Sequence, residues 1–376
     1  MSRCCPRCPR VSLVVLLLAL AVLLPTCLFA QMGMGGMGGA GPGPPLDRVD
    51  TLAFAKNGTL LAGAGENKIR IWTREPCKLV RTMTTEPWIR CIAAAPRGTL
   101  LAVNCSDRLA LWDIEAGVVF KTLFTGGAVG TDTNHVAFSP DGKLLASVHN
   151  QRDPDGDMTK AAATIRLWDV DRGVETTAFA QEPGTHAYAL AFAPDGTSFV
   201  VGIVHSSGQR LQWTEIRLVR IDRSLLDWTV GRTQTAVREL AYSPDGQLLA
   251  AAGWRYTLGI RAESVAELSL WNVSTGKRLW WVENSLQGAP EFSPEGLSIA
   301  GISRTNARSE IVIRDVATSR TRTLGDLDAD PHGRCQIAYS PDGTVLAACS
   351  GQRLVLLDTE TLAVRETLWP LPPDAD

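Results

Sequence analysis

The chain has 376 residues, of which 45% are hydrophobic, 20% charged and 6% aromatic. This apolar content excludes disorder for most of the chain, because it can bury a substantial core. Lys and Arg number 37 against 39 Asp and Glu, so the formal net charge is −2. Nucleic-acid binding requires clustered positive charge to displace phosphate counterions, and this balance disfavours it.

Residues 1–30 have the composition of an export signal. Arginines precede the apolar run Val11–Leu24, which is shorter than the roughly 20 residues that span a bilayer. Cleavage after Ala30 is the interpretation we favour. An uncleaved N-terminal anchor and a lipid-modified Cys27 are the alternatives. All three would export the remaining chain, to the periplasm, the outside, or the outer face of a membrane.

Residues 31–45 read QMGMGGMGGAGPGPP and contain almost only Gly, Met and Pro. Nothing in this segment can form a core, and ordering its glycines would be costly in entropy. The composition therefore predicts a flexible tether between the leader and the residues that follow.

The remainder, residues 46–376, repeats one phrase seven times, as in VAFSPDGKLLA and LAYSPDGQLLA. Alternating apolar residues enter a turn in which Pro presets φ, Asp bonds its own backbone and Gly takes a positive φ. The turn glycines recur every 40 to 54 residues, at Gly58, Gly98, Gly142, Gly196, Gly246, Gly296 and Gly343. Four short strands occupy roughly 40–45 residues, so the period predicts one propeller blade per repeat.

A third strand follows each turn and ends at a common dipeptide position, as in LALWD and IRLWD. At this position the sequence resembles the WD40 repeat family. The residues that match its Trp-Asp motif are Trp72, Trp112, Asp113, Trp168, Asp169, Trp271, Asp315 and Asp358. The resemblance implies an all-β fold, a seven-bladed β-propeller of four-stranded antiparallel blades that is monomeric, lacks a cofactor and binds protein partners.

The chain departs from that family in two respects. The Gly-His pair that braces WD40 blades is missing, and only His186 and His332 lie near its place. Polar bracing is therefore expected to be sparse, with apolar packing between blades supplying most of the stability. The seven sets of strands also begin without a spare outer strand, so we expect the ring to close by packing of the seventh blade on the first.

The connection between the second and third strands is longer in four consecutive repeats. The separation between the turn glycine and the dipeptide position is 14 residues in repeats 1, 2 and 7. It is 26, 23, 25 and 18 residues in repeats 3, 4, 5 and 6. In a propeller these connections share one face with the blade-to-blade links, so we expect a ridge there that binds a protein or peptide. The ridge carries residue types enriched at binding hot spots, namely His205, Arg210, Trp213, Trp254, Arg255, Tyr256, Arg261, Arg304 and Arg308. The alternative is that the insertions simply lengthen the two strands.

Two further patterns leave alternatives open. Asp153, Asp155 and Asp157 resemble the start of a calcium loop but lack a distal Glu, so a solvated turn is the competing interpretation. Cys335 and Cys349 flank the last turn glycine almost symmetrically. They could bridge across that hairpin or remain buried free thiols.

The first strands are expected to line the central channel with small and apolar residues, which argues against catalysis. The alternative is a metal-dependent, lactonase-like hydrolase with a site at the channel mouth. Its candidate ligands are His135, His332 and the acids Asp326, Asp328 and Asp330. A bracing or solvated role is the competing interpretation for His135.

Overall fold

The computed structural model describes residues 48–55, 58–86, 88–105, 108–125, 131–151, 157, 159–207, 210–222, 226–256, 264–283, 288–305, 308–324, 327, 335–350 and 353–369. The chain divides into two units, Met1–Gly43 and Pro44–Asp376, and every described residue belongs to the second. The predicted leader and tether therefore lie outside the described residues. The described part of the chain contains no helix that is long and apolar enough to cross a membrane.

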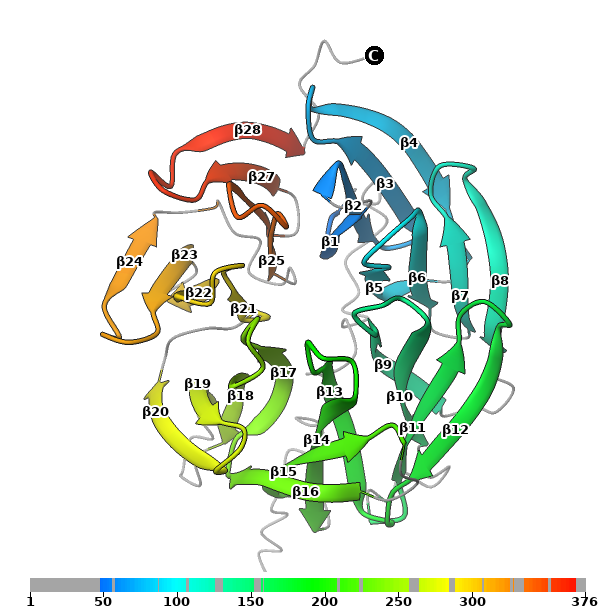
Figure 1. The fold of residues 1–376 in the computed structure, drawn as a ribbon, viewed down its shortest axis with the longest axis vertical. Coiled ribbons are helices and arrows are strands. Elements are labelled where there is room, and N and C mark those ends of the chain that lie inside the picture. Colours follow the sequence, from blue (N-terminus) through cyan, green and yellow to red (C-terminus); the bar gives the residue numbers. More distant parts are fainter. Residues whose placement is uncertain are drawn as a thin grey trace, which may run out of the picture. The chain divides into compact units, whose positions relative to one another are not determined.

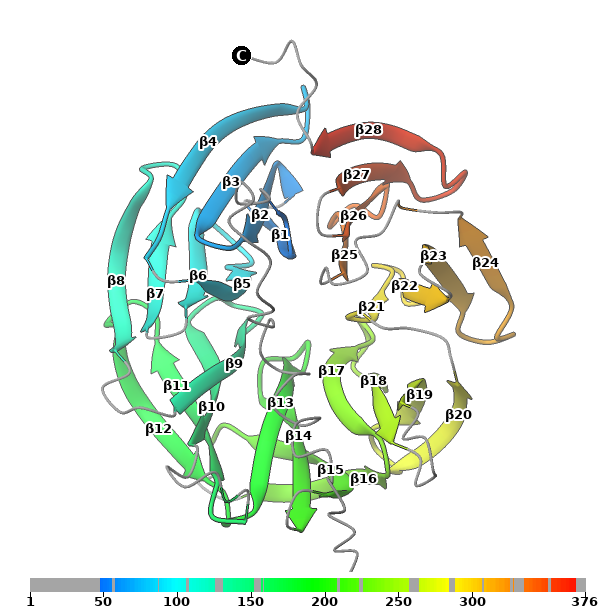
Figure 2. The ribbon, with the colours of Figure 1, turned by 180° about the vertical axis from the view of Figure 1, so that it is seen from behind.

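The second unit consists of seven four-stranded antiparallel sheets arranged in a ring, as Figures 1 and 2 show from opposite sides. This confirms the predicted seven-bladed propeller. Blades 1 to 3 contain β1 (Thr51–Ala55), β2 (Leu60–Gly65), β3 (Lys68–Thr73), β4 (Lys78–Thr84), β5 (Ile89–Ala94), β6 (Leu100–Cys105), β7 (Arg108–Asp113), β8 (Val118–Thr125), β9 (Thr131–Phe138), β10 (Leu144–Gln151), β11 (Ala162–Asp169) and β12 (Val174–Ala180). Blades 4 and 5 contain β13 (Thr185–Phe192), β14 (Ser198–Ser207), β15 (Arg210–Arg220), β16 (Leu226–Thr233), β17 (Ala236–Tyr242), β18 (Leu248–Tyr256), β19 (Ser264–Asn272) and β20 (Lys277–Glu283). Blades 6 and 7 contain β21 (Glu291–Phe292), β22 (Ser298–Thr305), β23 (Arg308–Asp315), β24 (Thr321–Leu324), β25 (Cys335–Tyr339), β26 (Val345–Ser350), β27 (Arg353–Asp358) and β28 (Val364–Trp369).

The repeated phrase forms the turn between the first two strands of each blade. In blade 3 the Ser139 hydroxyl donates to the Asp141 carboxylate over 2.6 Å and accepts from the Leu144 backbone N–H over 2.9 Å. Gly142 completes the turn with φ of 76°, a conformation that side chains disfavour. The hydrogen bond from Ser139 is the main cause that lowers the pKa of Asp141. The Ser-Pro-Asp-Gly phrase is thus explained by local turn chemistry.

The Asp of the dipeptide motif shapes the turn between the third and fourth strands of a blade. The Asp113 carboxylate accepts from the backbone N–H groups of Glu115 and Ala116, both over 2.9 Å. The other motif aspartates accept backbone N–H bonds in the same way, namely Asp169, Asp315 and Asp358. These residues therefore have a structural role as turn caps.

Serine braces some blades where the histidine of the WD40 pattern is missing. In blade 3 the Trp168 indole N–H donates to the Ser147 hydroxyl over 2.8 Å, and that hydroxyl lies 2.8 Å from His149 Nε2. In blade 5 the Trp271 indole donates to Ser269 over 2.9 Å. The buried His149 was not anticipated, because it lies in β10 and not before a first strand. Burial, followed by the charge of nearby Arg166, lowers its pKa to about 3.

Blade 7 packs directly on blade 1, which confirms the expected mode of closure. One buried cluster joins Leu61 and Trp72 of blade 1 to Leu354 and Leu356 of blade 7. Every sheet of the described region uses four strands that are consecutive in sequence, so no strand is shared between blades. The two blades are held together mainly by the burial of apolar surface between them.

Polar contacts also cross the closing seam. The Leu52 backbone N–H donates to the Gln336 side chain over 2.8 Å. Arg74 and Asp342 form an ion pair with an N–O distance of 2.7 Å. A surface pair of this kind adds little stability, but it fixes how the two blades meet.

The bridge left open between Cys335 and Cys349 is not formed, since both are free thiols. The register pairs Cys335 with Ser350 and Gln336 with Cys349, one residue away from the symmetric pairing expected from the sequence. A one-residue offset in a strand places the two side chains on opposite faces of the sheet, so of the two alternatives the structure has the free thiols, with Cys349 buried and Cys335 half-buried.

Candidate binding face

The insertions lengthen strands more than they build loops. In blades 1, 2 and 7 the second and third strands have 6 residues each, whereas β14 has 10 and β15 has 11. Only residues 208–209 separate those two strands, and only 306–307 separate β22 from β23. The predicted ridge of loops is therefore wrong for blades 4 and 6, where paired strands extend by the mechanism that we gave as the alternative.

The ends of these strands lie beside the links between blades, as predicted. The Ser206 backbone N–H donates to the Gly184 carbonyl in the link from blade 3 to blade 4, over 2.9 Å. The Gly184 N–H in turn donates to the Ala161 carbonyl, which follows the blade 3 insertion, over 2.8 Å. Insertions and links therefore share one face, which we call the insertion face.

The extended part of blade 4 brings two predicted residues together. His205 and Trp213 are paired across β14 and β15, and their rings stack with centroids 3.8 Å apart and planes inclined by 14°. The guanidinium of Arg232, from β16, lies over the Trp213 ring at 4.6 Å. We call these three side chains, together with Glu215 and Arg217, the blade 4 cluster.

Glu215 organises this cluster from beneath, with only 4% of its side chain exposed. Its carboxylate accepts hydrogen bonds from Thr229 over 2.6 Å and from Arg217 over 2.7 Å, and Arg232 approaches to 3.5 Å. Burial alone would raise the pKa of Glu215, but the hydrogen bonds from Thr229 and Arg217 outweigh it, and the pKa is lowered. Glu215 therefore remains a carboxylate that fixes both arginines.

The cluster presents one cation to solvent. Burial is the main cause that lowers the pKa of His205, so the imidazole is neutral near pH 7. Arg217 also donates to Gln181 of the link over 3.1 Å and is 26% exposed, whereas 66% of the Arg232 side chain is exposed. Two arginines against one carboxylate leave a net charge of +1, and that charge is located at the guanidinium that rests on an aromatic ring.

The other predicted residues of the ridge are not assembled into a site by the described contacts. Trp254 lies in β18 opposite Ala236 and is half-buried. For the arginines and tyrosine within strands, the structure gives only their positions in β15, β18, β22 and β23, and their side chains lie outside the described residues: Arg210, Arg255, Tyr256, Arg304 and Arg308. Arg261 lies wholly outside the described residues.

The inner strands carry more charge than the expected small and apolar wall. His135 of blade 3 and Glu239 of blade 5 approach within 3.4 Å, although blade 4 lies between them in the sequence. The guanidinium of Arg238 lies 3.7 Å from the centroid of the Tyr188 ring. His135 and Glu239 each stand seven residues before their turn glycine, and this shared position was the signal that sequence reasoning missed.

Blade 6 also departs from the expected wall. Six of the seven repeats have Ala five residues before the turn glycine, whereas repeat 6 has Glu291 there. The carboxylate of Glu291 accepts the Tyr339 backbone N–H of blade 7 over 2.9 Å. Burial of this carboxyl raises its pKa to about 8, although the residue as a whole keeps some exposed surface.

The described residues contain no group of three His, Cys, Asp or Glu placed to hold a metal ion. Asp157 accepts hydrogen bonds from the backbone and hydroxyl of Thr159, over 2.9 and 2.6 Å, as a turn residue does. The remaining candidate ligands lie outside the described residues: Asp153, Asp155, Asp326, Asp328, Asp330 and His332.

Comparisons with known proteins agree with this architecture. The chain is 29% identical over 156 residues to a WD repeat-containing protein, SL1-17, of Schistosoma mansoni. That match covers 41% of this chain and 44% of the relative, so less than half of the relative's length is matched. Among solved structures, the Kuenenia stuttgartiensis hydrazine synthase aligns with a TM-score of 0.66 at 14% identity, over 87% of this chain and 99% of that one. The second likeness shows the fold alone. No family model matches the chain.

Proposed function

Because the chain is a seven-bladed propeller with WD40-like repeats, we propose that it is a non-catalytic protein that binds a protein or peptide partner through its insertion face. WD repeats typically act as scaffolds for protein binding. The observation that supports this proposal here is the blade 4 cluster, in which a buried carboxylate holds an exposed arginine on a tryptophan.

The cluster has the features of a binding hot spot. Trp213 and Arg232 combine apolar area with directed hydrogen-bond donors, the two properties that concentrate binding energy at interfaces. Glu215 orders Arg232 before a partner arrives, so part of the entropic cost of binding is already met. The net charge of +1 favours a partner that brings a carboxylate to this site.

Two substitutions test the site. Peptides that bind the wild-type chain are first selected from a random library. Their affinity for the variants Trp213→Ala and Arg232→Gln is expected to be lower by at least about tenfold, because each variant lacks a hot-spot side chain. Affinities are measured by calorimetry. Trp228→Ala is the matched control, because Trp228 is 49% exposed on the outer strand β16 and lies outside the cluster. Equal affinity of wild type and Trp213→Ala would place the site elsewhere.

We propose in addition that the protein is exported, because residues 1–30 contain arginines followed by an apolar run, as an export signal does. N-terminal sequencing of the protein from its native source tests this proposal. With a cleaved signal the first residue is expected to be Gln31. A chain that retains its apolar run would instead support the anchor.

A further inference from the structure

At three of the seven seams between blades, the described residues share a cationic contact at the outer strands. A basic side chain from the fourth strand of one blade donates to a backbone carbonyl in the turn before the fourth strand of the next blade. The three donor–acceptor pairs are Arg81 to Glu115 over 2.8 Å, Lys121 to Arg172 over 2.8 Å, and Arg322 to Glu360 over 3.0 Å. We call this contact the cationic brace.

The seam that closes the ring reverses this arrangement. The strand register places Glu366 of β28 opposite Leu356, just as Arg81 of β4 is placed opposite Ile71. Glu366 therefore occupies the position of the brace in blade 7, and a carboxylate cannot donate to a carbonyl. The seam between blades 7 and 1 has an acid at the position where three seams have a cation, and the remaining three seams have Thr177, Trp228 and Trp280 there.

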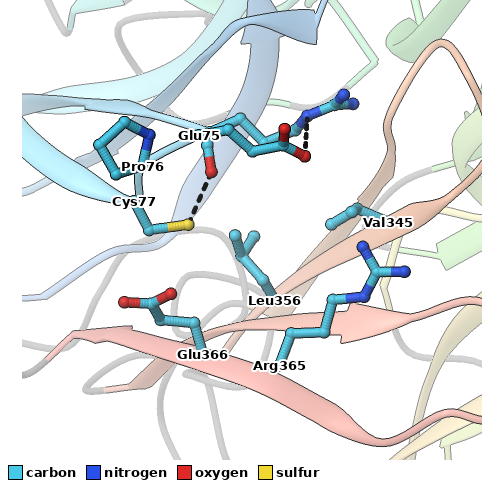
Figure 3. Close-up of a pocket in the computed structure, with 8 residues that line it drawn as sticks. Glu75, Pro76, Cys77, Val345, Leu356, Arg365 and Glu366 are labelled. Atoms are coloured by element: carbon cyan, nitrogen blue, oxygen red, sulfur yellow. Dashed lines mark hydrogen bonds and ion pairs between the residues drawn. The ribbon is translucent and has the colours of Figure 1, made fainter.

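A cavity of about 400 Å³ lies at this seam, and Figure 3 shows the side chains around it. Leu356 and Arg365 come from blade 7, where Glu366 points towards the blade 1 turn that contains Cys77. The full lining is Arg74, Glu75, Pro76, Cys77, Val345, Leu356, Arg365 and Glu366. The wall therefore combines aliphatic surface with charged groups of both signs.

The charges around the cavity sum to a negative value. Arg74 is paired with Asp342 at 2.7 Å, and Arg365 donates to Asp358 through both Nε and Nη2. Hydrogen bonds lower the pKa of both aspartates, so these acids are ionised at neutral pH. With Glu75 and Glu366 there are four carboxylates against two arginines, 2 − 4 = −2. The cavity is therefore electrostatically complementary to a cation.

Cys77 contributes no charge to the cavity. Its thiol donates to the Arg74 carbonyl over 2.8 Å. Burial, and then the adjacent Glu366, raises the pKa of this thiol to about 11. Because this thiol is neutral, Glu366 is the charged acceptor available to a cation bound in the cavity.

We propose that this cavity receives the lysine or arginine side chain of a peptide partner, which takes the place of the missing cationic brace. The cationic head pairs with Glu366 and donates to the Glu75 carbonyl, which corresponds to the Glu115 and Glu360 carbonyls at braced seams. The methylene stem lies along Leu356 and Val345, which suits the amphipathic build of both side chains. The site is separate from the blade 4 cluster and extends the proposed function.

Binding of short peptides to the full chain tests this inference. Saturation-transfer NMR is expected to detect Ac-Gly-Arg-Gly-NH2 and Ac-Gly-Lys-Gly-NH2, but not Ac-Gly-Gln-Gly-NH2. The bound peptides are also expected to slow alkylation of Cys77, mapped by mass spectrometry, while leaving Cys91 unchanged as the internal control; both thiols are half-buried. Equal binding of the Gln and Arg peptides would overturn the proposal.

Two variants at Glu366 separate charge from shape. Glu366→Gln is expected to weaken binding of the Arg peptide about tenfold, because a charge-assisted hydrogen bond is lost. Glu366→Arg is expected to supply the brace itself, and so to abolish peptide binding and raise the thermal midpoint. Unchanged binding in both variants would show that the cavity is not the site. Trp213→Ala should leave this binding intact, so failure here is distinguishable from failure of the blade 4 site.

Discussion

The unfolding free energy of the propeller is expected to fall by about 3 kcal/mol between pH 7 and pH 4 through the titration of His149 alone. The imidazole titrates near 6.5 in the unfolded chain and at about 3 when folded. Between those values the unfolded state binds the extra proton, so stability decreases as the pH falls. Protonation of His149 is unfavourable in the folded state, because its imidazole is buried against Ser147 and Phe124.

His149→Gln isolates this contribution. Glutamine retains a group that can bond Ser147 but does not titrate, so the stability of the wild type relative to the variant is expected to decrease by about 3 kcal/mol between pH 7 and pH 4. Urea unfolding at each pH measures both proteins. Parallel curves for wild type and variant would contradict the assignment.

The same stability profile is expected to decline on its alkaline side because of Glu291. Its pKa is 4.5 when unfolded and about 8 when folded, so the folded state holds the proton longer. The contribution of Glu291 to stability is therefore lost as the pH rises, by about 3 kcal/mol between pH 5 and pH 8, opposite in sign to the contribution of His149. Glu291→Gln keeps an acceptor for the Tyr339 N–H and should remove this decline.

Gly253→Ala is expected to destabilise the fold by more than about 4 kcal/mol, or to prevent folding. A Cβ at Gly253 would lie 2.0 Å from the Ala236 carbonyl oxygen and 2.9 Å from Val237 Cα. Both contacts are with backbone, at the irregular start of β17, so neither can be relieved by turning a side chain. Chemical denaturation and the yield of soluble protein measure the effect.

Gly202→Ala in β14 is the matched control for that substitution. Its added Cβ would meet side-chain carbons of Val237 at 3.3 and 3.4 Å, and these can shift slightly. We expect a loss below about 1.5 kcal/mol there. If the two variants were equally stable, the backbone contact at Gly253 would not be the constraint that we infer.

Local features of the sequence predicted the blades well. The hydrogen bonds that form the Ser-Pro-Asp-Gly turn, such as that from Ser139 to Asp141, join residues that are close in sequence, so a few residues are enough to predict the turn. The alternation of apolar residues on either side then identifies the paired strands. Ring closure by blade 7 on blade 1 could also be inferred, because it follows from counting strands.

The contacts of the candidate site depend on information that local patterns do not contain. The stack of His205 on Trp213 requires the insertion of blade 4 to continue as strand, and the turn signal Ser207-Gly208 within it does not by itself decide between a tight hairpin and a longer loop. The approach of His135 to Glu239 joins residues two blades apart. A register offset of one residue was enough to separate Cys335 from Cys349. In each case long-range packing determined the outcome.

The use of four consecutive strands in every sheet has a consequence for how the ring could be cut. In a propeller whose last blade borrows a strand from the other end of the chain, that blade is already divided between the two termini. Here a cut at any described blade-to-blade link would leave each sheet intact, provided that the original ends were joined by a sufficiently long linker. Circularly permuted versions should therefore retain the same blades, and the position of the chain break is a matter of convenience in engineering this ring.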